Sequence, residues 1–204
     1  MTTLSTSLIL ASGSLARRVL LEESGLTPHL RPVDVNEEDL RKACEAEGKS
    51  LGQTAMILAD AKALKAAEAA GLETDLIIAA DQILDLDGTA FAKPKTLEEA
   101  KHHLRALRGR THRLQTAVVL YRGMQKIWAN LAVPELTMRE FSEVFLETYL
   151  EREGERLLGC VGAYRLEGPG VQLFSRIVGD HDAVLGLQRL PLLQALRAQN
   201  VILT

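Results

Sequence analysis

Asp81 is the residue whose position most strongly indicates chemistry. It follows the apolar run Leu76–Ala80, which is typical of a strand buried on both faces. The chain continues as an alternating segment to Leu86 and reaches Asp87-Gly88, a strong hairpin-turn signal. Aspartate is disfavoured inside an extended segment, and ligands of open α/β sheets bind at the carboxyl ends of strands. The position therefore favours a general base or a metal ligand over a helix cap or turn former.

A second group of candidates lies near the N-terminus, where a small-residue turn separates a strand from a helix. The apolar run Leu8–Ala11 predicts a buried strand, and helical spacing begins after Ser12 and Ser14. Free backbone N–H groups and the helix dipole make such a turn a cradle for an anion. Arg17 and Arg18 stand in the first helical turn, where the dipole disfavours cations, and a bound phosphate would resolve that conflict. The alternative is an ordinary first strand and helix with solvated arginines.

Two lysines are further candidates for binding an anion. Lys62 lies on the apolar stripe of a helix that is predicted from Leu51 to about Ala70, with Gly71 as its stop signal. Such a lysine either extends its ammonium group to water or reaches into a cleft. Lys93 ends a short return strand predicted after the hairpin, and it either reaches the same cleft or stays solvated beside the turn.

An acidic segment, Asn36–Asp39, follows an extended or edge-strand stretch, Leu26–Val35, that contains two prolines. The simplest interpretation is a solvated acidic loop. Near a phosphate site, a carboxylate of this loop such as Glu37 could instead hold a divalent cation, because the oxygen ligands of Mg²⁺ need no fixed sequence spacing. The sequence leaves both interpretations open.

Composition limits the class of protein. The chain has 204 residues, a formal charge of −3, 47% hydrophobic and 25% charged residues, which suits one globular domain with two lobes. The near-neutral charge and the aromatic content of 4% argue against a nucleic-acid binder. No apolar run approaches the span of a bilayer, and the N-terminus lacks the basic segment of a signal peptide. Cys44 and Cys160 give no disulfide framework and no metal spacing, so we expect a reducing, cytoplasmic setting.

The remaining patterns alternate between strands and helices and predict a mixed α/β fold. A helix should follow the capping box that Thr96 and Glu99 form. The other expected elements are strands at Thr111–Tyr121, Gln125–Val133, Leu136–Phe141 and Val171–Phe174, and helices at Ser142–Arg152 and Pro191–Gln199.

Five segments, taken in chain order, resemble the motifs of the Maf family of nucleoside triphosphate pyrophosphatases, also described as septum-formation inhibitors. They are LILASGSLAR (8–17), AADQ (79–82), FAKPKTLEEAKHHLRALRGRTH (91–112), GAYRLEG with LFSRIVGD (162–180), and LGLQRLPLLQALR (185–197). Each motif alone is weak, but together and in this order they are highly specific.

The resemblance implies a Maf/ITPase-like α/β fold, in which helices lie on both sides of a long, bent, mixed sheet around a central cleft. It also implies metal-dependent cleavage of a nucleoside triphosphate between the α and β phosphates, with Mg²⁺ or Mn²⁺ as cofactor. The products would be the nucleoside monophosphate and pyrophosphate. A homodimer is a further implication.

Site residues follow from the resemblance as well. Asp81 matches the catalytic carboxylate, which activates water or helps to hold the metal, and Glu37 matches the acidic segment that supplies an additional metal ligand. The residues expected to bind the phosphates are Ser12, Ser14, Arg17, Arg18, Lys62 and Lys93.

Base specificity in the family depends on three positions, which are Ala16, Gln82 and Glu167 here. The branch that acts on dTTP and UTP usually has arginine, threonine and glutamine, whereas the branch that prefers 7-methyl-GTP has tryptophan, glutamine and glutamate. Two of the three positions resemble the second branch, and the carboxylate of Glu167 could accept hydrogen bonds from guanine N1 and N2. Ala16 removes the aromatic stacking surface. We therefore expect a modified or unmodified purine triphosphate, with guanine favoured.

The chain departs from the family pattern at Leu15, Ala92, Ala117, Cys160 and Ala183. Activity is expected because the charged residues are retained, and weakened activity is the alternative. A hypothesis from another class is a nucleotide-binding regulator of cell division or septum formation with little or no catalysis. Asp81 and the four cations favour the enzyme, and the lack of a GxxxxGK[ST] pattern disfavours a kinase-like transferase.

Overall fold

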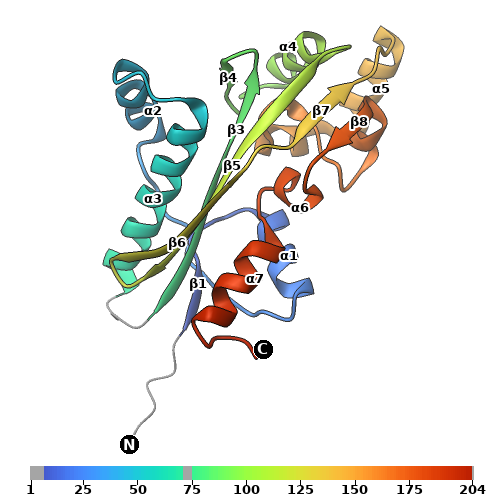
Figure 1. The fold of residues 1–204 in the computed structure, drawn as a ribbon. Helices are drawn as coiled ribbons and strands as arrows, with labels where there is room; N and C mark the ends of the chain where they lie inside the picture. The colour runs from blue at the N-terminus through green and yellow to red at the C-terminus, as the bar shows by residue number, and fades with distance from the viewer. Residues whose placement is uncertain (1–6, 71–74, 204) are drawn as a thin grey trace, which may run out of the picture. The chain divides into compact units, whose positions relative to one another are not determined.

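The computed structural model describes residues 7–70 and 75–203 (Figure 1). Within them, eight strands form one mixed sheet: β1 (Leu8–Leu10), β2 (His29–Leu30), β3 (Leu76–Leu86), β4 (Thr89–Phe91), β5 (Thr111–Arg122), β6 (Gln125–Ala132), β7 (Glu135–Met138) and β8 (Phe174–Val178). The strand order is β2-β1-β3-β5-β7-β8, with β4 beside β3 and β6 beside β5. β1 is parallel to β2 and β3, whereas β5 is antiparallel to β6 and β7. The predicted mixed α/β class is confirmed.

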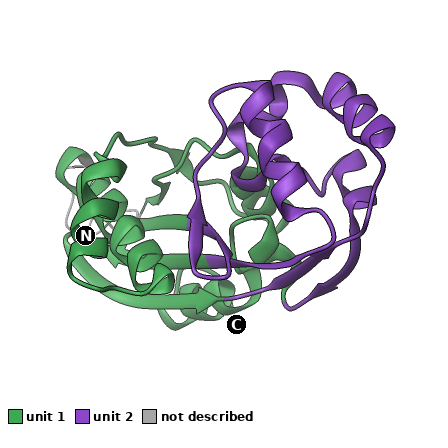
Figure 2. Ribbon diagram, turned by 90° about the horizontal axis from the view of Figure 1, so that it is seen from above, with its two compact units in different colours: residues 1–81, 116–132, 180–204 green, residues 82–115, 133–179 purple. Residues whose placement is uncertain are grey.

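The chain divides into two compact units (Figure 2). Unit 1 comprises residues 1–81, 116–132 and 180–204, and unit 2 comprises residues 82–115 and 133–179. β3 and β5 each contribute residues to both units. That residues 1–204 act as one domain stays a prediction.

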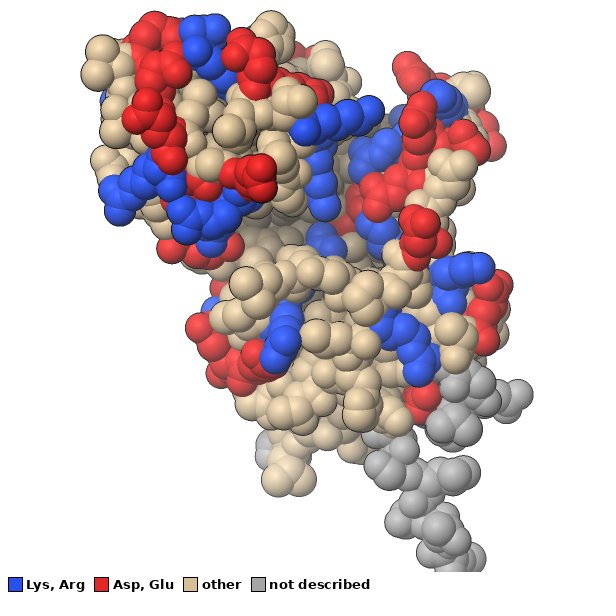
Figure 3. Space-filling model, turned by 180° about the vertical axis from the view of Figure 1, so that it is seen from behind, with Lys and Arg blue, Asp and Glu red and all other residues tan. Residues whose placement is uncertain are grey.

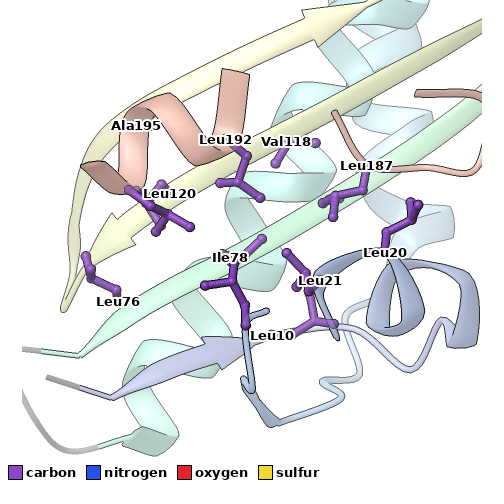
Figure 4. Close-up of a cluster of buried hydrophobic side chains, with 13 residues drawn as sticks. Leu10, Leu20, Leu21, Leu76, Ile78, Val118, Leu120, Leu187, Leu192 and Ala195 are labelled. Carbon is purple, nitrogen blue, oxygen red and sulfur yellow. The ribbon is translucent and has the colours of Figure 1, made fainter. Parts of the chain in front are cut away.

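In unit 1, one face of the sheet is covered by α1 (Leu15–Glu23) and α7 (Arg189–Ala198), as Figures 1 and 4 show. Their apolar side chains form a core with strand residues such as Leu10, Ile78 and Val118, each of which is 0% exposed. Leu76, Ile78 and Ala80 of β3 belong to this core, because alternate side chains of a strand point to the same face.

The other face of this sheet in unit 1 is covered by α3 (Leu51–Ala70) (Figure 1). The helix predicted from Leu51 is confirmed, and a capping box precedes it: Ser50 Oγ accepts from Gln53 N at 3.3 Å, and Gln53 Oε1 accepts from Ser50 N at 2.9 Å. The predicted stop at Gly71 lies outside the described residues. The small side chains on the buried stripe of α3 let it pack close to the strands. They are Ala55, Ala59, Ala63 and Ala66, all 0% exposed.

In unit 2, α4 (Leu97–Leu107) packs against α5 (Glu143–Glu153) and against two short 3-10 turns, η1 (Gly154–Gly159) and η2 (Val161–Ala163). Both predicted helix starts are confirmed by their caps. Thr96 Oγ1 accepts from Glu99 N at 3.1 Å, and Ser142 Oγ accepts from Phe145 N at 3.2 Å.

The strand predicted at Val171–Phe174 is wrong. A 3-10 turn, η3 (Pro169–Leu173), occupies most of this segment, and β8 begins only at Phe174. Pro169 has no N–H to donate to a strand ladder. Gly170 lies against the backbone, because a Cβ added there would be 2.4 Å from the carbonyl oxygen of Arg165. The apolar character of the segment therefore reflects burial within a turn.

The surface carries charges of both signs. Lys and Arg side chains are interleaved with Asp and Glu on the face shown in Figure 3. On α2 (Glu37–Ala46), for example, Lys42 and Glu38 pair at 2.6 Å while both are more than half exposed. No helix among the described residues combines the length and the apolar character needed to cross a membrane.

His112 of β5 is a buried titratable group in unit 2. Its side chain lies beside Tyr164, with 2.9 Å between Nε2 and the phenol oxygen, and the residue is 1% exposed. Phe174 covers the ring at a centroid distance of 6.0 Å. Burial lowers the pKa of His112 to about 4, because the charged imidazolium loses its hydration.

This burial predicts a pH dependence of stability. The ring has a pKa of about 6.5 in the unfolded chain, so between pH 6.5 and 4 the unfolded chain binds more protons than the folded one. The free energy of unfolding should therefore fall as the pH falls through this window, by about 2–3 kcal/mol between pH 7 and 4.5. His112→Gln should remove that part of the loss in urea titrations at the two pH values. His29→Gln, at an exposed position, should keep the wild-type dependence, and an unchanged slope in His112→Gln would contradict the prediction.

Candidate active site

Asp81 lies in the middle of β3, on the face opposite to the core formed with α1 and α7. Ile78 and Ala80 belong to that core, so Asp81 shares the other face with Ile77. The Asp81 side chain is only 5% exposed. β3 continues without interruption to Leu86, which confirms the predicted location of an aspartate inside an extended segment.

Lys62 brings a positive charge to Asp81 from α3. The helical spacing places it on the same stripe as Ala55 and Leu58, which are both buried. Its Nζ lies 2.6 Å from Asp81 Oδ1 and 2.7 Å from Glu37 Oε1, and its side chain is 14% exposed. Of the two alternatives for this lysine, the structure therefore supports the one in which the side chain reaches inward.

Glu37 is brought to the same place by a helix. The predicted acidic loop at Asn36–Asp39 is wrong, because Asn36 caps α2 and its Oδ1 accepts from Asp39 N at 3.2 Å. The acidic residues that follow Asn36 form the first turn of α2, where the helix dipole stabilises carboxylates. Glu37 thereby has a fixed direction toward Lys62 that a solvated loop would not provide.

Arg41 is a member of the site that the sequence reasoning missed. Its Nη2 lies 3.4 Å from Glu37 Oε2 and 3.7 Å from Asp81 Oδ2. Burial opposes ionisation of Glu37, but the hydrogen bond and charge of Lys62 and the charge of Arg41 outweigh it and hold the pKa of Glu37 below its ordinary value. The signal for Arg41 was present as an i,i+4 spacing from Glu37 behind a capping asparagine.

Arg17 is held by backbone carbonyls. Its Nη1 donates to Ala80 O at 2.8 Å and to Ser12 Oγ at 3.2 Å, and its Nε donates to Gly186 O at 2.9 Å. Gly186 has φ +96°, and a Cβ added there would lie 3.1 Å from Arg17 Nε. Glycine at 186 therefore allows the close approach that fixes the guanidinium beside the residue that precedes Asp81.

The charge of Arg17 also acts on the carboxylates. Burial lowers the pKa of Arg17, and the charges of Asp81 and Glu37 partly offset that effect. Ser14 has a structural role next to it, since its hydroxyl accepts from Arg17 N at 3.4 Å and caps α1. The predicted turn between strand and helix is thus confirmed, and it holds one cation close to the site.

Arg18 is placed differently from Arg17. Its Nε lies 2.7 Å from Glu22 Oε1, and the two side chains are 47% and 43% exposed. Because this pair lies on the outer surface of α1, the structure does not join Arg18 to the Asp81 cluster. Ala16, on the same helix, is partly buried.

Three of the predicted residues belong to unit 2. Lys93 and Glu167 are both exposed and both act on Cys160. Burial raises the pKa of the Cys160 thiol, the charge of Glu167 raises it further, and Lys93 lowers it. Lys93 and Glu167 therefore lie in the same electrostatic neighbourhood of unit 2. Gln82 follows Asp81 on β3, and its side chain points to the opposite face of the strand.

The cluster in unit 1 fits a divalent cation that takes only part of its ligands from the protein. Asp81 Oδ2 is buried and has no hydrogen-bond partner among the described residues. Glu37 supplies the second carboxylate, and the described residues contain no group of three or more His, Cys, Asp or Glu arranged as a metal site. Mg²⁺ is commonly held by one or two carboxylates together with water and substrate phosphates, and two carboxylates match that pattern.

Comparison with known proteins identifies the family. Residues 7–199 match the family described as Maf-like protein. The chain belongs to the Maf family. The Maf match spans the candidate site in unit 1 and all of unit 2, so the predicted family resemblance is confirmed.

Curated Maf relatives cover almost the whole chain. A protein named nucleoside triphosphate pyrophosphatase from Gluconobacter oxydans is 62% identical over 99% of both chains. One of the same name from Granulibacter bethesdensis is 45% identical over 96% of this chain and 98% of its own. A protein named 7-methyl-GTP pyrophosphatase from Rhizobium etli is 44% identical over 96% of this chain and 97% of its own.

Proposed function

We propose that this protein is a nucleoside triphosphate pyrophosphatase, a hydrolase that cleaves the α–β phosphoanhydride to give the nucleoside monophosphate and pyrophosphate. The observation that carries the proposal is the partly buried cluster in which Lys62 contacts both Asp81 and Glu37. Relatives that bear this enzyme name match the chain over nearly its full length. Removal of modified or noncanonical nucleotides is the physiological role that we assign to this activity.

The chemistry requires positive charge for the phosphates and a carboxylate for the water. Asp81 supplies the carboxylate that activates the attacking water or holds the cation, and its buried Oδ2 is available for either contact. A divalent cation, Mg²⁺ or Mn²⁺, would be held by Glu37 and Asp81, and when bound it neutralises phosphate charge and orients water. The residues proposed to bind phosphate are Ser12, Ser14, Arg17, Arg18, Lys62 and Lys93.

To bind phosphate, the Arg18 side chain would have to move, and the substrate would have to reach Lys93 directly. Arg18 would have to leave Glu22, an exposed i,i+4 pair of a kind that contributes at most about 0.5 kcal/mol. Lys93 is exposed and follows β4 in unit 2. These two cations are therefore the weaker members of the proposed set.

We further propose a guanine-type base, with 7-methyl-GTP favoured over dTTP and UTP. Gln82 and Glu167 support this choice, and Glu167 is an exposed residue in a turn. The name of the Rhizobium etli relative points the same way. Ala16, which lacks an aromatic ring, should limit how strongly a methylated base is preferred over an unmodified one.

A panel of triphosphates tests both statements. With Mg²⁺ or Mn²⁺ present, we expect pyrophosphate and the monophosphate as products. We expect kcat/KM for GTP or 7-methyl-GTP to be about 5- to 150-fold above that for dTTP and UTP, because good base-edge contacts are worth about 1–3 kcal/mol. Ion chromatography distinguishes pyrophosphate from orthophosphate. Faster hydrolysis of dTTP and UTP would refute the guanine assignment alone. Tight nucleotide binding without turnover would refute the enzyme and support a nucleotide-binding regulator of cell division.

Location and assembly complete the proposal. The thiols Cys44 and Cys160 are both unpaired in the structure, which is compatible with a reducing, cytoplasmic compartment. We propose a homodimer, and sedimentation of the purified protein would determine its mass.

A further inference from the structure

Arg41 differs from the other cations of the site in how it is held. Lys62 contacts one oxygen of each carboxylate at 2.6 and 2.7 Å. Arg41 faces the second oxygen of each, at 3.7 Å from Asp81 Oδ2 and 3.4 Å from Glu37 Oε2. Charge-assisted hydrogen bonds are normally about 2.7–2.9 Å long. The guanidinium is therefore close enough to neutralise the carboxylates but is not tightly bonded to them.

The position of Arg41 allows its side chain to move. It projects from α2, four residues after Glu37, and its side chain is 31% exposed compared with 14% for Lys62. Arg17, in contrast, is fixed by two backbone carbonyls at 2.8 and 2.9 Å. Among the cations around Asp81 within the described residues, Arg41 thus combines the longest contacts with the greatest exposure.

The balance of charge explains why such mobility matters. Asp81 and Glu37 bring two negative charges, Lys62 and Arg41 pair with both of them, and the nearby Arg17 adds a further positive charge. A divalent cation that took the oxygens faced by Arg41 would repel the guanidinium at short range. The displaced guanidinium would then find new acceptors in the triphosphate, since its planar fork matches phosphate oxygens in a bidentate way.

We propose that Arg41 is an exchangeable counter-ion. It neutralises Glu37 and Asp81 while the site holds no divalent cation, and it binds phosphate oxygens of the nucleoside triphosphate once a cation occupies these carboxylates. The inference rests on the proposed function, because it assigns a further substrate-binding residue to that site. None of the five sequence segments that resemble the family includes Arg41. Its role is therefore inferred from the contacts of Arg41 in this structure and not from the family motifs.

Arg41→Met tests the proposal because its two consequences have opposite signs. Binding of Mn²⁺ to the protein alone, followed by electron paramagnetic resonance, should become about 3- to 30-fold tighter, since a competing positive charge is removed. Binding of an α,β-methylene triphosphate with Mg²⁺, followed by calorimetry, should become about 10- to 100-fold weaker, since a charge-assisted hydrogen bond is lost. KM should rise similarly, with kcat within a few fold.

Lys42→Met is the matched control. Lys42 is the next residue on α2 and forms the same kind of i,i+4 pair, with Glu38 at 2.6 Å, but its side chain is 67% exposed. It should leave both affinities within about twofold of wild type, because exposed pairs contribute little. Arg41→Lys keeps the charge and removes the planar fork, so it should leave Mn²⁺ affinity unchanged while weakening the analogue. It also provides the test if Arg41→Met does not fold.

The outcomes separate this inference from the proposed function. If the Mn²⁺ and analogue affinities of Arg41→Met change in the same direction, or match those of Lys42→Met, the counter-ion role is wrong while the enzyme assignment stands. If the wild-type protein turns over no triphosphate, the enzyme assignment is wrong, whatever the variant does. Tighter Mn²⁺ binding together with weaker analogue binding supports the exchange.

Discussion

Asp81→Asn is expected to lower kcat by about 10²–10⁴-fold, the usual contribution of a general base. The amide cannot accept the proton of an attacking water and is a poor ligand for a hard divalent cation. The substitution is nearly isosteric, so the fold should persist even though the Asp81 side chain is 5% exposed. Initial rates of pyrophosphate release from the preferred triphosphate, with circular dichroism as the check on folding, measure this effect.

Asp85→Asn is the matched control for that experiment. Asp85 lies four residues further along β3 and accepts hydrogen bonds from Gln115 Nε2 at 3.0 Å and from Gly88 N at 2.8 Å. Its role is to hold the hairpin, so its loss should affect stability and leave kcat within a few fold. A folded Asp81→Asn variant that retains near-wild-type turnover would remove Asp81 from the mechanism.

Lys62→Met is expected to cause the largest loss of stability among single changes in the site. It removes the closest partner of Asp81 and leaves a carboxylate that is 5% exposed, with Arg41, at 3.7 Å, as its remaining ion-pair partner among the described residues. Breaking a buried ion pair from one side costs about 3–5 kcal/mol, and the partial exposure of Lys62 places the effect at or below the lower end. Urea denaturation at pH 7 measures it. Turnover should fall as well, because a phosphate-binding cation is lost.

A double mutant distinguishes the buried charge from lost packing. Lys62→Met combined with Asp81→Asn should recover much of the stability, since no uncompensated charge remains. Lys65→Met, on the same helix and in an exposed pair with Glu68 at 3.6 Å, should change the free energy of unfolding by less than about 0.5 kcal/mol. If the double mutant is as unstable as Lys62→Met alone, the instability comes from altered packing around residue 62 and not from the unpaired carboxylate of Asp81.

Elements whose signals are local were predicted well. Each of four helix N-caps accepts a hydrogen bond, through its side-chain oxygen, from the backbone N–H of the residue three positions later; they are Ser14, Ser50, Thr96 and Ser142. Such caps are local signals, because capping depends on a few neighbouring residues. The Asp87-Gly88 turn forms as predicted, with both residues at positive φ. β3 was recognisable because Leu76–Ala80, all 0% exposed, form the continuous apolar run expected of a strand buried on both faces.

The errors arose where composition and backbone constraints conflict. Asn36–Asp39 is a helix start whose acidic composition resembles a loop, and the capping pattern was the stronger local signal. The segment at Val171 is apolar enough for a strand, but Pro169 and the packing of Gly170 against Arg165 fix it as a turn. Both cases show composition giving way to backbone constraints.

By itself, the sequence determined that Asp81 ends an apolar run inside a strand, that Lys62 lies on the buried stripe of a helix, and that the motifs follow the order of the Maf family. Only the tertiary structure decided which charges meet. It separated Arg17, which donates to Ala80 O, from the adjacent Arg18, which pairs with Glu22 on the surface. It also added Arg41. Lys62 and Arg41 lie 19 and 40 residues before Asp81 in the sequence, so whether they meet it depends on how α3 and α2 pack relative to β3. The spacing of residues in the sequence determines which face of its own helix or strand a side chain lies on. The neighbour that it contacts there is determined by the packing between elements.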